Sequence, residues 1–163
     1  MSKRPPLKPA DVHIVVADSE SRQESEMKIF TADGKLLYRL RCLAKGQHAD
    51  YKIPKGDTPP GLYKLGTLYE TQKGEPWYTW NSFGRYFLDM EGQEQNEEKF
   101  GRAGCGVHGG GSSSPNPLAP DQGLYPTHGC VRLLNRDMEN VLVPLYRKTQ
   151  ANGGTVWMTV HQF

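Results

Sequence analysis

The chain has 163 residues, of which 20 are lysine or arginine and 18 are aspartate or glutamate, so the net charge is only +2. The basic residues form no long stripe, which argues against nucleic acid as a partner. No segment is apolar over the length that a bilayer requires, which argues against a membrane span. One domain of this length can bury its own core, so no cofactor is needed for folding.

Short strands and turns dominate the first part of the chain. After a proline-rich arm, the β-branched run at residues 12–17 is typical of a buried strand. Two further strands, at residues 27–30 and 35–40, flank an Asp-Gly pair, which favours a tight hairpin because it accepts positive φ. We expect this hairpin to join the first strand in one sheet.

The middle of the chain continues the pattern. Residues 58–61 (TPPG) force a turn, because proline fixes φ and lacks a donor, and residues 62–65 then alternate as a strand does. Residues 77–86 are rich in aromatic side chains and precede a strand at 86–90. Aromatic side chains at this density favour the core, with the wall of a cleft as the alternative. The acidic run at 91–99 indicates a solvated loop, with a site for a cationic ligand as the alternative.

The C-terminal third contains the one predicted helix. Asn135 is a good N-cap residue, and apolar side chains then recur at spacings of three and four. Pro144 falls inside this pattern and should kink the helix or end it early. Two glycines at 153–154 end the helix, and residues 155–160 form a final strand. The chain is therefore predicted to be mainly β, a single domain of twisted antiparallel and mixed sheets with one helix.

One stretch gathers the groups that nucleophilic catalysis needs. Residues 127–132 (THGCVR) place a thiol two residues after a histidine, and on an extended chain residues two apart share a face. Another histidine, His108, precedes three glycines, which allow a backbone to approach a ligand closely. A thiol is mostly protonated at neutral pH, so a catalytic cysteine needs a base or a positive field beside it. Cys130 is the candidate nucleophile, with His108 and His128 as candidate bases.

These residues resemble the signature of the L,D-transpeptidase catalytic domains, which are cysteine enzymes that cross-link or trim bacterial peptidoglycan. The family pairs an upstream His-Gly, here His108-Gly109, with a downstream motif like residues 127–132. Residues 58–65 (TPPGLYKL) match a second family pattern that begins a strand. The resemblance runs from about residue 28 to residue 160. The connection between the two parts of the signature is a few residues longer than is usual in the family.

The resemblance implies roles for the two histidines and the cysteine. His108, oriented by the backbone carbonyl of Gly109, takes the thiol proton, and Cys130 attacks an amide carbonyl. His128 lies close to the cysteine, supports it and ranks second as a base.

The resemblance also implies an oxyanion and substrate-binding group around the cysteine. The backbone N–H groups of Gly129 and Cys130 receive the developing oxyanion, and Thr127 belongs to the same group. Arg132 either holds a substrate carboxylate in a bidentate contact or braces the loop. Tyr86 is the nearest candidate for the family's oxyanion tyrosine.

For the whole chain, the resemblance implies a β-sandwich of the L,D-transpeptidase type over residues 25–163. Residues 1–24 supply an N-terminal arm and the first strand of the same domain. The implied reaction cleaves the L,D bond before a terminal D-amino acid of a peptidoglycan stem peptide, without a cofactor or metal. The acyl group then passes to an amine or to water.

Peptidoglycan places the action in the bacterial periplasm or cell wall. Residues 1–9 have a basic start but no apolar run behind it, so they do not resemble a secretory signal. The expected route is therefore another one, including delivery as an antibacterial effector, unless a signal has been removed.

Two other interpretations of the site remain open. Cys105-x-x-His108 and His128-x-Cys130 supply the sulfur and nitrogen ligands of a structural zinc site. A non-catalytic wall-binding module would keep the fold without turnover, although binding alone needs no thiol. In an exported protein Cys42 and Cys105 are the suspected disulfide pair, and two buried free thiols are the alternative.

Overall fold

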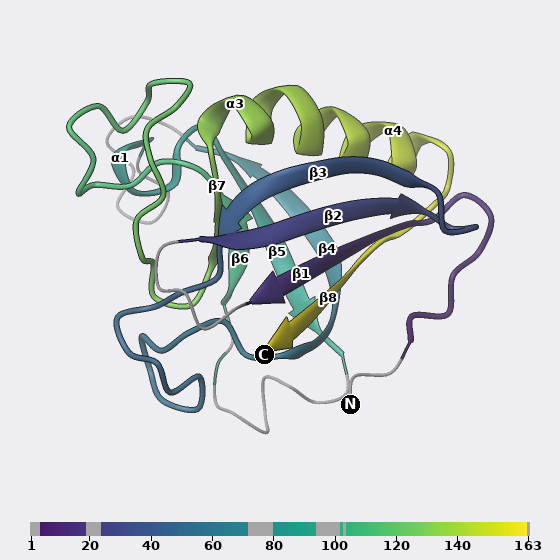
Figure 1. Cartoon of the computed structure of the whole chain (residues 1–163). Helices are drawn as coiled ribbons and strands as arrows, with labels where there is room; N and C mark the ends of the chain where they lie inside the picture. Colours follow the sequence, from purple (N-terminus) through teal and green to yellow (C-terminus); the bar gives the residue numbers. More distant parts are fainter. Residues whose placement is uncertain (1–3, 19–23, 72–79, 94–101, 103, 163) are drawn as a thin grey trace.

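In a computed structural model, the strands close into one barrel-like sheet with a helical segment packed along its upper side (Figure 1). The structure describes residues 4–18, 24–71, 80–93, 102 and 104–162. Around the barrel the strands follow the order β1-β2-β3-β7-β6-β5-β4-β8. The mainly β class is therefore confirmed, and a single closed sheet takes the place of the two stacked sheets of a sandwich.

In chain order the elements are β1 (Val12–Asp18), β2 (Ser25–Thr31), β3 (Leu36–Leu43), β4 (Gly61–Glu70), α1 (Trp80–Phe83), β5 (Tyr86–Gly92), β6 (Gly106–His108), β7 (Val131–Leu133), α3 (Asn135–Asp137), the π-helical η1 (Met138–Leu142), α4 (Val143–Ala151) and β8 (Val156–Gln162).

The predicted hairpin and its neighbouring strand are present. β2 pairs antiparallel with both β1 and β3. Gly34 takes a φ of +94° in the turn between β2 and β3, and its N–H donates to Thr31 O at 3.0 Å. Burial alternates along β1 and β2, so every second side chain enters the core. Hydrophobic burial on one face therefore fixes the register of this hairpin.

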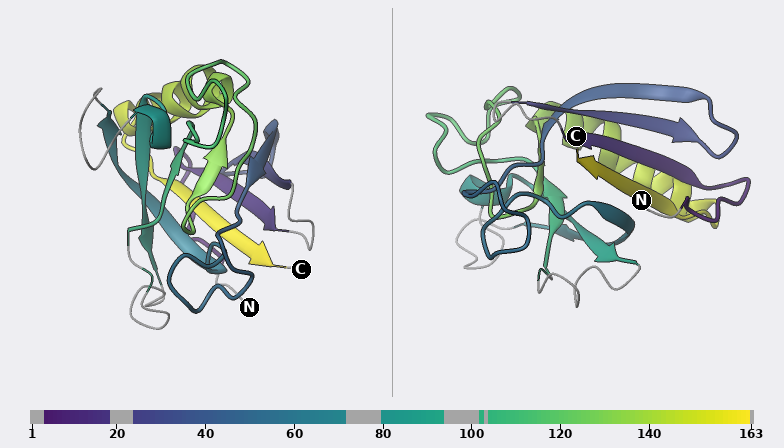
Figure 2. Two further views of the ribbon diagram at one scale, coloured as in Figure 1. Left: turned by 90° about the vertical axis from the view of Figure 1, so that its left-hand side faces the viewer. Right: turned by 60° about the horizontal axis from the view of Figure 1, so that its bottom comes forward.

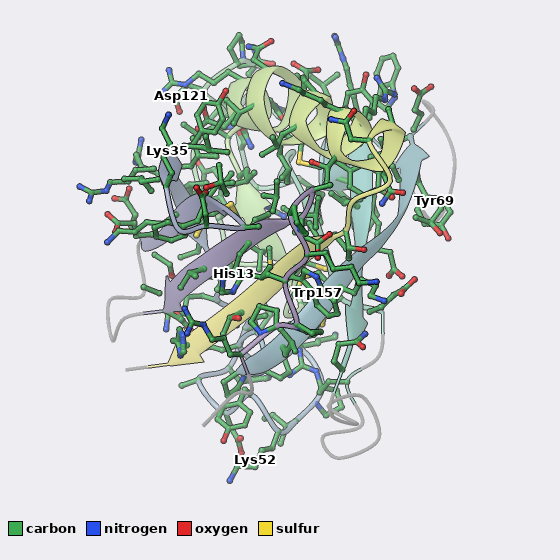
Figure 3. The ribbon with its side chains drawn as sticks, turned by 90° about the vertical axis from the view of Figure 1, so that its right-hand side faces the viewer. His13, Lys35, Lys52, Tyr69, Asp121 and Trp157 are labelled. Atoms are coloured by element: carbon green, nitrogen blue, oxygen red, sulfur yellow. The ribbon has the colours of Figure 1, made fainter. Side chains whose placement is uncertain are left out.

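The barrel closes because the two ends of the chain lie side by side. β8 pairs in parallel with β1 and antiparallel with β4, and both further views show β8 between them (Figure 2). Figure 3 views this side, where the labelled His13 and Trp157 are partners in the β1–β8 register. His13 Nε2 lies 2.8 Å from Thr159 Oγ1 on the same strand pair. Closure gives each strand two neighbours, which removes free sheet edges at these positions.

The helical segment differs from its prediction at its first residue, and it does not end at its proline. Asn135 is the first helical residue, but its side chain caps no backbone group of the helix. The π-helical η1 precedes Pro144, which lies in the first turn of α4. Proline has no N–H to donate to the preceding turn. The wider π turn before it tolerates this missing hydrogen bond, so the helical segment continues instead of ending early. Four of its side chains enter the barrel core: Met138, Leu142, Val143 and Tyr146.

The three cysteines are all free thiols. The suspected pairing of Cys42 with Cys105 is wrong, because β7 lies between β3, which carries Cys42, and β6, which follows Cys105. Two strand spacings amount to about 10 Å. That separation is well beyond the Cα distance of about 7 Å that a disulfide tolerates.

Some predictions fall on residues outside the described ranges, namely those for Trp77, Tyr78, Glu94, Glu97 and Glu98. Within the described ranges no helix is both long and apolar enough to cross a membrane.

Candidate active site

Two short parallel strands bring the candidate residues to one face of the sheet. His108 on β6 is the register partner of Arg132 on β7. Cys130 directly precedes β7, and its Sγ accepts a hydrogen bond from the Gly106 N–H at 3.4 Å. Side chains two residues apart on a strand share a face. His108, Cys130 and Arg132 therefore point to the same side of the β6–β7 pair.

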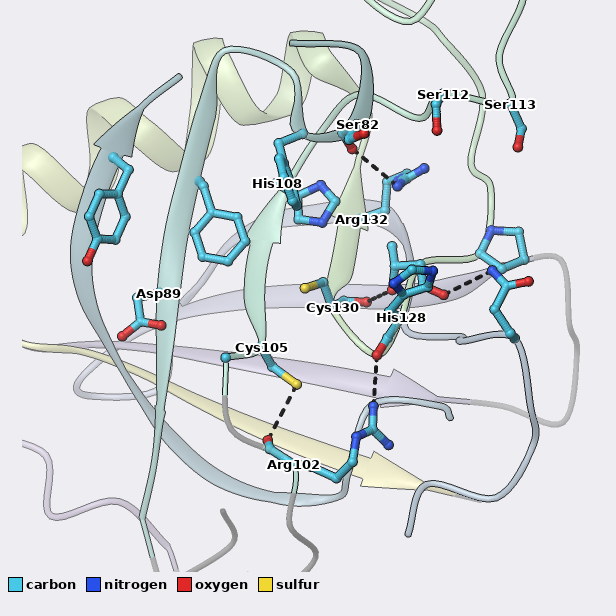
Figure 4. Close-up of a pocket in the computed structure, with 17 residues that line it drawn as sticks. Ser82, Asp89, Arg102, Cys105, His108, Ser112, Ser113, His128, Cys130 and Arg132 are labelled. Carbon is cyan, nitrogen blue, oxygen red and sulfur yellow. Dashed lines mark hydrogen bonds between the residues drawn. The ribbon is translucent and has the colours of Figure 1, made fainter. Parts of the chain in front are cut away.

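These three side chains line a cavity of about 660 Å³, shown in Figure 4. His128 and Arg102 line it as well. This volume lies within the range of sites that hold small ligands or a short peptide.

His108 is held as a neutral base. It is only 1% exposed, and its Nδ1 lies 2.7 Å from the Gly109 carbonyl oxygen. Because a carbonyl can only accept, Nδ1 carries the proton and Nε2 is the free acceptor. The ring stacks on Phe87 at 5.7 Å between centroids and meets the edge of Phe83 at 4.8 Å. Burial, together with the charge of Arg132, lowers the pKa of His108 to about 3.

Cys130 is held as a protonated thiol. Burial raises its pKa to about 11, and the Gly106 N–H and the charges of Arg132 and Arg102 only partly oppose this shift. A neutral thiol beside a neutral imidazole means that proton transfer accompanies nucleophilic attack, since no ion pair exists beforehand. Among the described residues no hydrogen bond joins the thiol to the His108 ring, so the two groups must approach before the proton moves.

The loop that carries Cys130, the candidate nucleophile, is held by its backbone carbonyls; we call residues 127–130 the nucleophile loop. Three consecutive carbonyls accept side-chain donors from different segments: His128 O from Arg102 Nη2 at 2.9 Å, Gly129 O from Thr58 Oγ1 at 2.8 Å and Cys130 O from Thr127 Oγ1 at 2.9 Å. Thr58 begins the TPPG segment that the sequence places before β4. The two motifs that are far apart in the sequence therefore meet beside Cys130.

The two predicted oxyanion donors, the N–H groups of Gly129 and Cys130, differ in whether they already have a hydrogen-bond acceptor. The Gly129 N–H donates to Thr127 Oγ1 at 3.0 Å, so it is already engaged. The peptide between Gly129 and Cys130 is trans, so the Cys130 N–H points away from the carbonyl that Thr58 holds. Within the described part of the chain the Cys130 N–H has no acceptor. In this conformation it is the donor available to an oxyanion.

Arg102 is a functional candidate that the sequence did not reveal. It is 7% exposed. Its guanidinium also donates to the carbonyls of Tyr51, Gly56 and Asp57, at 2.7, 3.1 and 3.3 Å. A Cβ at Gly129 would lie 1.9 Å from Arg102 Nη2 and would displace the guanidinium, and the φ of +116° at Gly129 also favours glycine. Backbone carbonyls are present at every position, so a side chain that binds them leaves no motif in the sequence.

A buried group of charges supports the same loop. Lys45 Nζ lies 2.8 Å from Asp18 Oδ1 and 3.6 Å from Asp57 Oδ2. The backbone of Lys45 accepts a hydrogen bond from the Thr127 N–H at 2.9 Å. Burial raises the pKa of Asp18, although its contacts with Lys45 oppose the shift. The nucleophile loop thus rests on charged side chains that are out of contact with water.

Two amide side chains hold the glycine turn that follows His108. Asn135 Oδ1 accepts from the Gly110 N–H at 2.9 Å, and Gln122 Nε2 donates to Gly110 O at 3.1 Å. The Asn135 N–H donates to Gln122 Oε1 at 2.8 Å. Gly110 has a φ of +67°, a region that favours glycine. Asn135 therefore serves this turn instead of capping its helix.

Arg132 is a buried cation with unused donor capacity. It is 5% exposed, its Nη2 makes a long contact of 3.5 Å with Ser82 O, and its Nε has no partner among the described residues. Burial lowers its pKa to about 10, so it stays charged at neutral pH. The single long contact braces it only weakly, which leaves the guanidinium available to a ligand.

The structure brings His128 to the cavity but not Tyr86. The His128 side chain is exposed and lines the cavity, while its carbonyl is held in the loop. The Tyr86 ring instead lies 5.6 Å from the Arg147 guanidinium and does not line the cavity. Tyr69 is a tyrosine that does line it.

The zinc interpretation finds no ligand set here. Within the described residues no three His, Cys, Asp or Glu side chains come together as metal ligands would. Cys105 Sγ instead lies 3.8 Å from Arg102 O.

Comparison with solved structures identifies the fold. The helical cell shape determining protein Pgp2 from Campylobacter jejuni is 19% identical, with a TM-score of 0.54, and the match covers 93% of this chain and 48% of that chain. Bd1075 from Bdellovibrio bacteriovorus is 15% identical, with a TM-score of 0.53, and the match covers 99% of this chain and 50% of that chain. The chain thus spans about half the length of these two proteins.

Comparison of the sequence itself gives the family. No curated protein matches it significantly. The family described as L,D-transpeptidase catalytic domain (YkuD) matches residues 12–151, a range that includes strands β1 to β7, His108 and the loop at residues 127–130. The chain therefore belongs to the L,D-transpeptidase catalytic domain family.

Proposed function

We propose that this protein is a cysteine-dependent acyltransferase that acts on peptidoglycan stem peptides at the bacterial cell wall. It cleaves the L,D bond before a terminal D-amino acid and passes the acyl group to an amine or to water. The observation that supports this most directly is the shared cavity, in which a thiol, a neutral imidazole and a buried guanidinium occupy neighbouring positions on β6 and β7.

In the first half-reaction, Cys130 Sγ attacks the carbonyl carbon while His108 Nε2 takes the thiol proton. The Cys130 N–H stabilises the oxyanion that forms. His108 then gives the proton to the nitrogen of the leaving D-amino acid as the C–N bond breaks. The products are a free D-amino acid and a thioester on Cys130.

In the second half-reaction, an amine or water attacks the thioester while His108 accepts its proton. The C–S bond breaks, and the proton returns from His108 to the sulfur. An amine as acceptor gives a cross-link or an exchanged D-amino acid, and water gives a shortened stem.

Arg132 is the proposed partner for a substrate carboxylate. Its charge is buried beside Cys130, and its Nε is unused among the described residues. A guanidinium binds a carboxylate through two parallel hydrogen bonds, which would orient the terminal D-residue.

Purified sacculi digested with the wild-type protein, followed by mass spectrometry of the muropeptides, test this function. We expect tetrapeptide stems to disappear and to be replaced by tripeptide stems, by 3–3 cross-links or by exchanged stems, depending on the acceptor. Cys130→Ala should leave the muropeptides unchanged. An unchanged pattern with folded wild-type protein would contradict the proposal.

A further inference from the structure

A turn of serines lies at the cavity on the side of Arg132. Ser112 and Ser113 line the cavity, and Figure 4 shows both on the same side of the thiol as Arg132. Gly111, the residue before them, touches the guanidinium, since a Cβ at Gly111 would lie 2.6 Å from Arg132 Nη1. We call residues 111–114 the serine turn. It lies between the two parts of the family signature, at residues 108–109 and 127–132, and belongs to neither.

The serine turn is fixed at both of its ends. The Ser114 N–H donates to Gly111 O at 2.9 Å, which closes the turn. The Gly111 N–H donates to Asn81 O at 2.8 Å, and Ser114 Oγ donates to Gln122 O at 2.7 Å. The two serines between these anchors are therefore held in place without the use of their own hydroxyls.

The hydroxyls of Ser112 and Ser113 are open to a ligand. Both side chains are exposed, and among the described residues neither serine makes a hydrogen bond. Ser114 differs, because it is buried and its hydroxyl is engaged. A hydroxyl can rotate to donate to an acceptor that lies beside it. The cavity thus offers two unengaged donors close to the weakly braced guanidinium of Arg132.

A carboxylate bound to Arg132 needs more donors than the guanidinium supplies. A carboxylate offers about four lone pairs, and a bidentate guanidinium satisfies two of them. Arg132 is 5% exposed, so a ligand bound to it is largely withdrawn from water. A lone pair that loses water without gaining another donor costs free energy. Hydroxyls beside the guanidinium would remove that cost.

The spacing along β7 indicates which carboxylate this is. Arg132 lies two residues from Cys130 on the same face of the chain, about 7 Å between Cα atoms. In a substrate, a single residue separates the attacked carbonyl carbon from the carboxylate of a terminal amino acid, a span of at most about 3.6 Å. A terminal amino acid that lies along β7 therefore brings its carboxylate toward Arg132 while the scissile carbonyl stays at the thiol.

We propose that Ser112 and Ser113 determine specificity for a free terminal carboxylate, which their hydroxyls bind together with the Arg132 guanidinium. The ligand is the carboxylate of the D-amino acid that leaves during acylation. In the exchange reaction a D-amino acid enters by the reverse of that path, so the same donors select the incoming amino acid. This inference rests on the proposed acyl transfer at Cys130 and adds two residues to its substrate site.

The test uses two tetrapeptide stems that differ only at the last residue, which is D-alanine in one and D-alaninamide in the other. Single-turnover acylation of Cys130 is followed by intact-mass spectrometry over a range of stem concentrations. We expect the wild type to favour the free acid. In the double variant Ser112→Ala/Ser113→Ala the acylation efficiency with the free acid should fall about tenfold, because hydrogen bonds to a charged group are lost.

The form of that loss separates binding of the carboxylate from a general disturbance of the site. The carboxylate is bound both before and during attack, so the apparent affinity should fall while the maximal rate stays nearly unchanged. The amide stem should react nearly as it does with the wild type. Ser112→Thr/Ser113→Thr keeps both hydroxyls and should restore most of the preference. Asn116→Ala removes an exposed side chain of the same connection, outside the cavity, and should match the wild type.

Three results would overturn the serine site. They are equal efficiencies for the two stems in the wild type, a preference for the free acid that persists undiminished in the double alanine variant, and an equal loss for both stems in that variant.

Absence of any adduct from either stem in the wild type would contradict acyl transfer itself. Calorimetric binding of the two stems to Cys130→Ala needs no turnover and tests the serines separately. A preference for the free acid that the alanine substitutions weaken would support the serine site, and no preference would overturn it.

Discussion

The nucleophile loop and the turn after His108 are positioned by different kinds of side chain. The loop at residues 127–130 is held by the Arg102 guanidinium and by threonine hydroxyls, above buried charges. The turn at Gly110 is held by two uncharged amides, Asn135 and Gln122. Both regions contain glycines with positive φ, so the backbone alone does not explain the difference.

The side chains that hold the two regions also differ in how they affect the pKa of Cys130 and of His108. Near Cys130, Arg102 holds the loop, and the charges of both Arg102 and Arg132 favour the thiolate because they oppose the rise in the thiol pKa. Amides near His108 hold the turn without adding a charge that would lower the pKa of the imidazole further. Each region therefore uses donors that suit the charge that Cys130 or His108 would develop in the proposed reaction.

Removal of the nucleophile should give the largest effect. Cys130→Ala should abolish turnover because the proposed thioester can no longer form at this position, while the fold persists because only a half-buried sulfur is lost. Release of D-alanine from tetrapeptide stems and the circular dichroism spectrum measure the two consequences. Cys105→Ala should retain activity. An active Cys130→Ala together with an inactive Cys105→Ala would contradict the assignment.

The pH dependence of thiol alkylation in the free protein tests whether the Cys130 thiol and the His108 imidazole are both uncharged at neutral pH. Because the pKa of Cys130 is raised to about 11, alkylation by iodoacetamide should rise about tenfold per pH unit, or about 10³-fold from pH 7 to pH 10. With its pKa lowered to about 3, His108 stays neutral throughout this pH range and adds no inflection to the pH profile of the alkylation rate. The signal lost in Cys130→Ala gives the rate for this thiol. A plateau at neutral pH would instead indicate a preformed thiolate–imidazolium pair.

Arg102→Met should disturb the nucleophile loop. Four carbonyls lose a donor, each at a cost of roughly 1–3 kcal/mol where the group stays buried. A displaced nucleophile loses about 10²-fold in kcat/KM. Kinetics and thermal denaturation measure both effects, and added guanidinium should restore part of the rate.

Arg147→Met removes an exposed arginine that pairs with Glu70 and serves as the control for Arg102→Met. Wild-type kcat/KM in Arg102→Met would show that the loop needs no such donor.

Asn135→Ala should have the smallest of these effects. The turn loses contacts to Gly110 and to the carbonyls of Pro117 and Ala119, which should lower stability by about 1–3 kcal/mol. The His108 ring keeps its own bond to Gly109 O, so we expect only about a tenfold loss of rate. Urea denaturation and kcat/KM give the values, with the exposed Asn152→Ala as control. A greater loss of rate than in Arg102→Met would show that the turn after His108 depends more on its side-chain contacts than the loop at residues 127–130 does.

Local patterns predicted the strands well, and they selected candidate residues that line one cavity. Alternation and the Asp-Gly turn gave the hairpin of β2 and β3, because both signals are contained within a few residues. The spacing in residues 127–132 and the glycines after His108 pointed to the cavity, because each motif lies on a single strand end. The structure also explains why the TPPG segment accompanies residues 127–132, since the Thr58 hydroxyl donates to Gly129 O.

Features that depend on contacts between segments far apart in the chain could not be predicted from the sequence. Closure of the barrel requires β1 to pair with β8, near the opposite end of the chain, and no local signal encodes that partner. The suspected Cys42–Cys105 disulfide failed for the same reason, because the position of β7 between them was unknown. Asn135 was read as a helix cap because the loop that it binds is distant in sequence.

The central claim, that Cys130 forms a thioester with the L-centre of a stem peptide, can be measured directly. The protein is mixed separately with a tetrapeptide stem and with a pentapeptide stem ending in D-Ala-D-Ala, and its intact mass is recorded. A fixed direction of attack tests the stereochemistry at the α-carbon next to the carbonyl. We therefore expect a tripeptide adduct on Cys130 from the tetrapeptide alone. An adduct from the pentapeptide with loss of one D-alanine would show a D,D-specific enzyme and would contradict the claim.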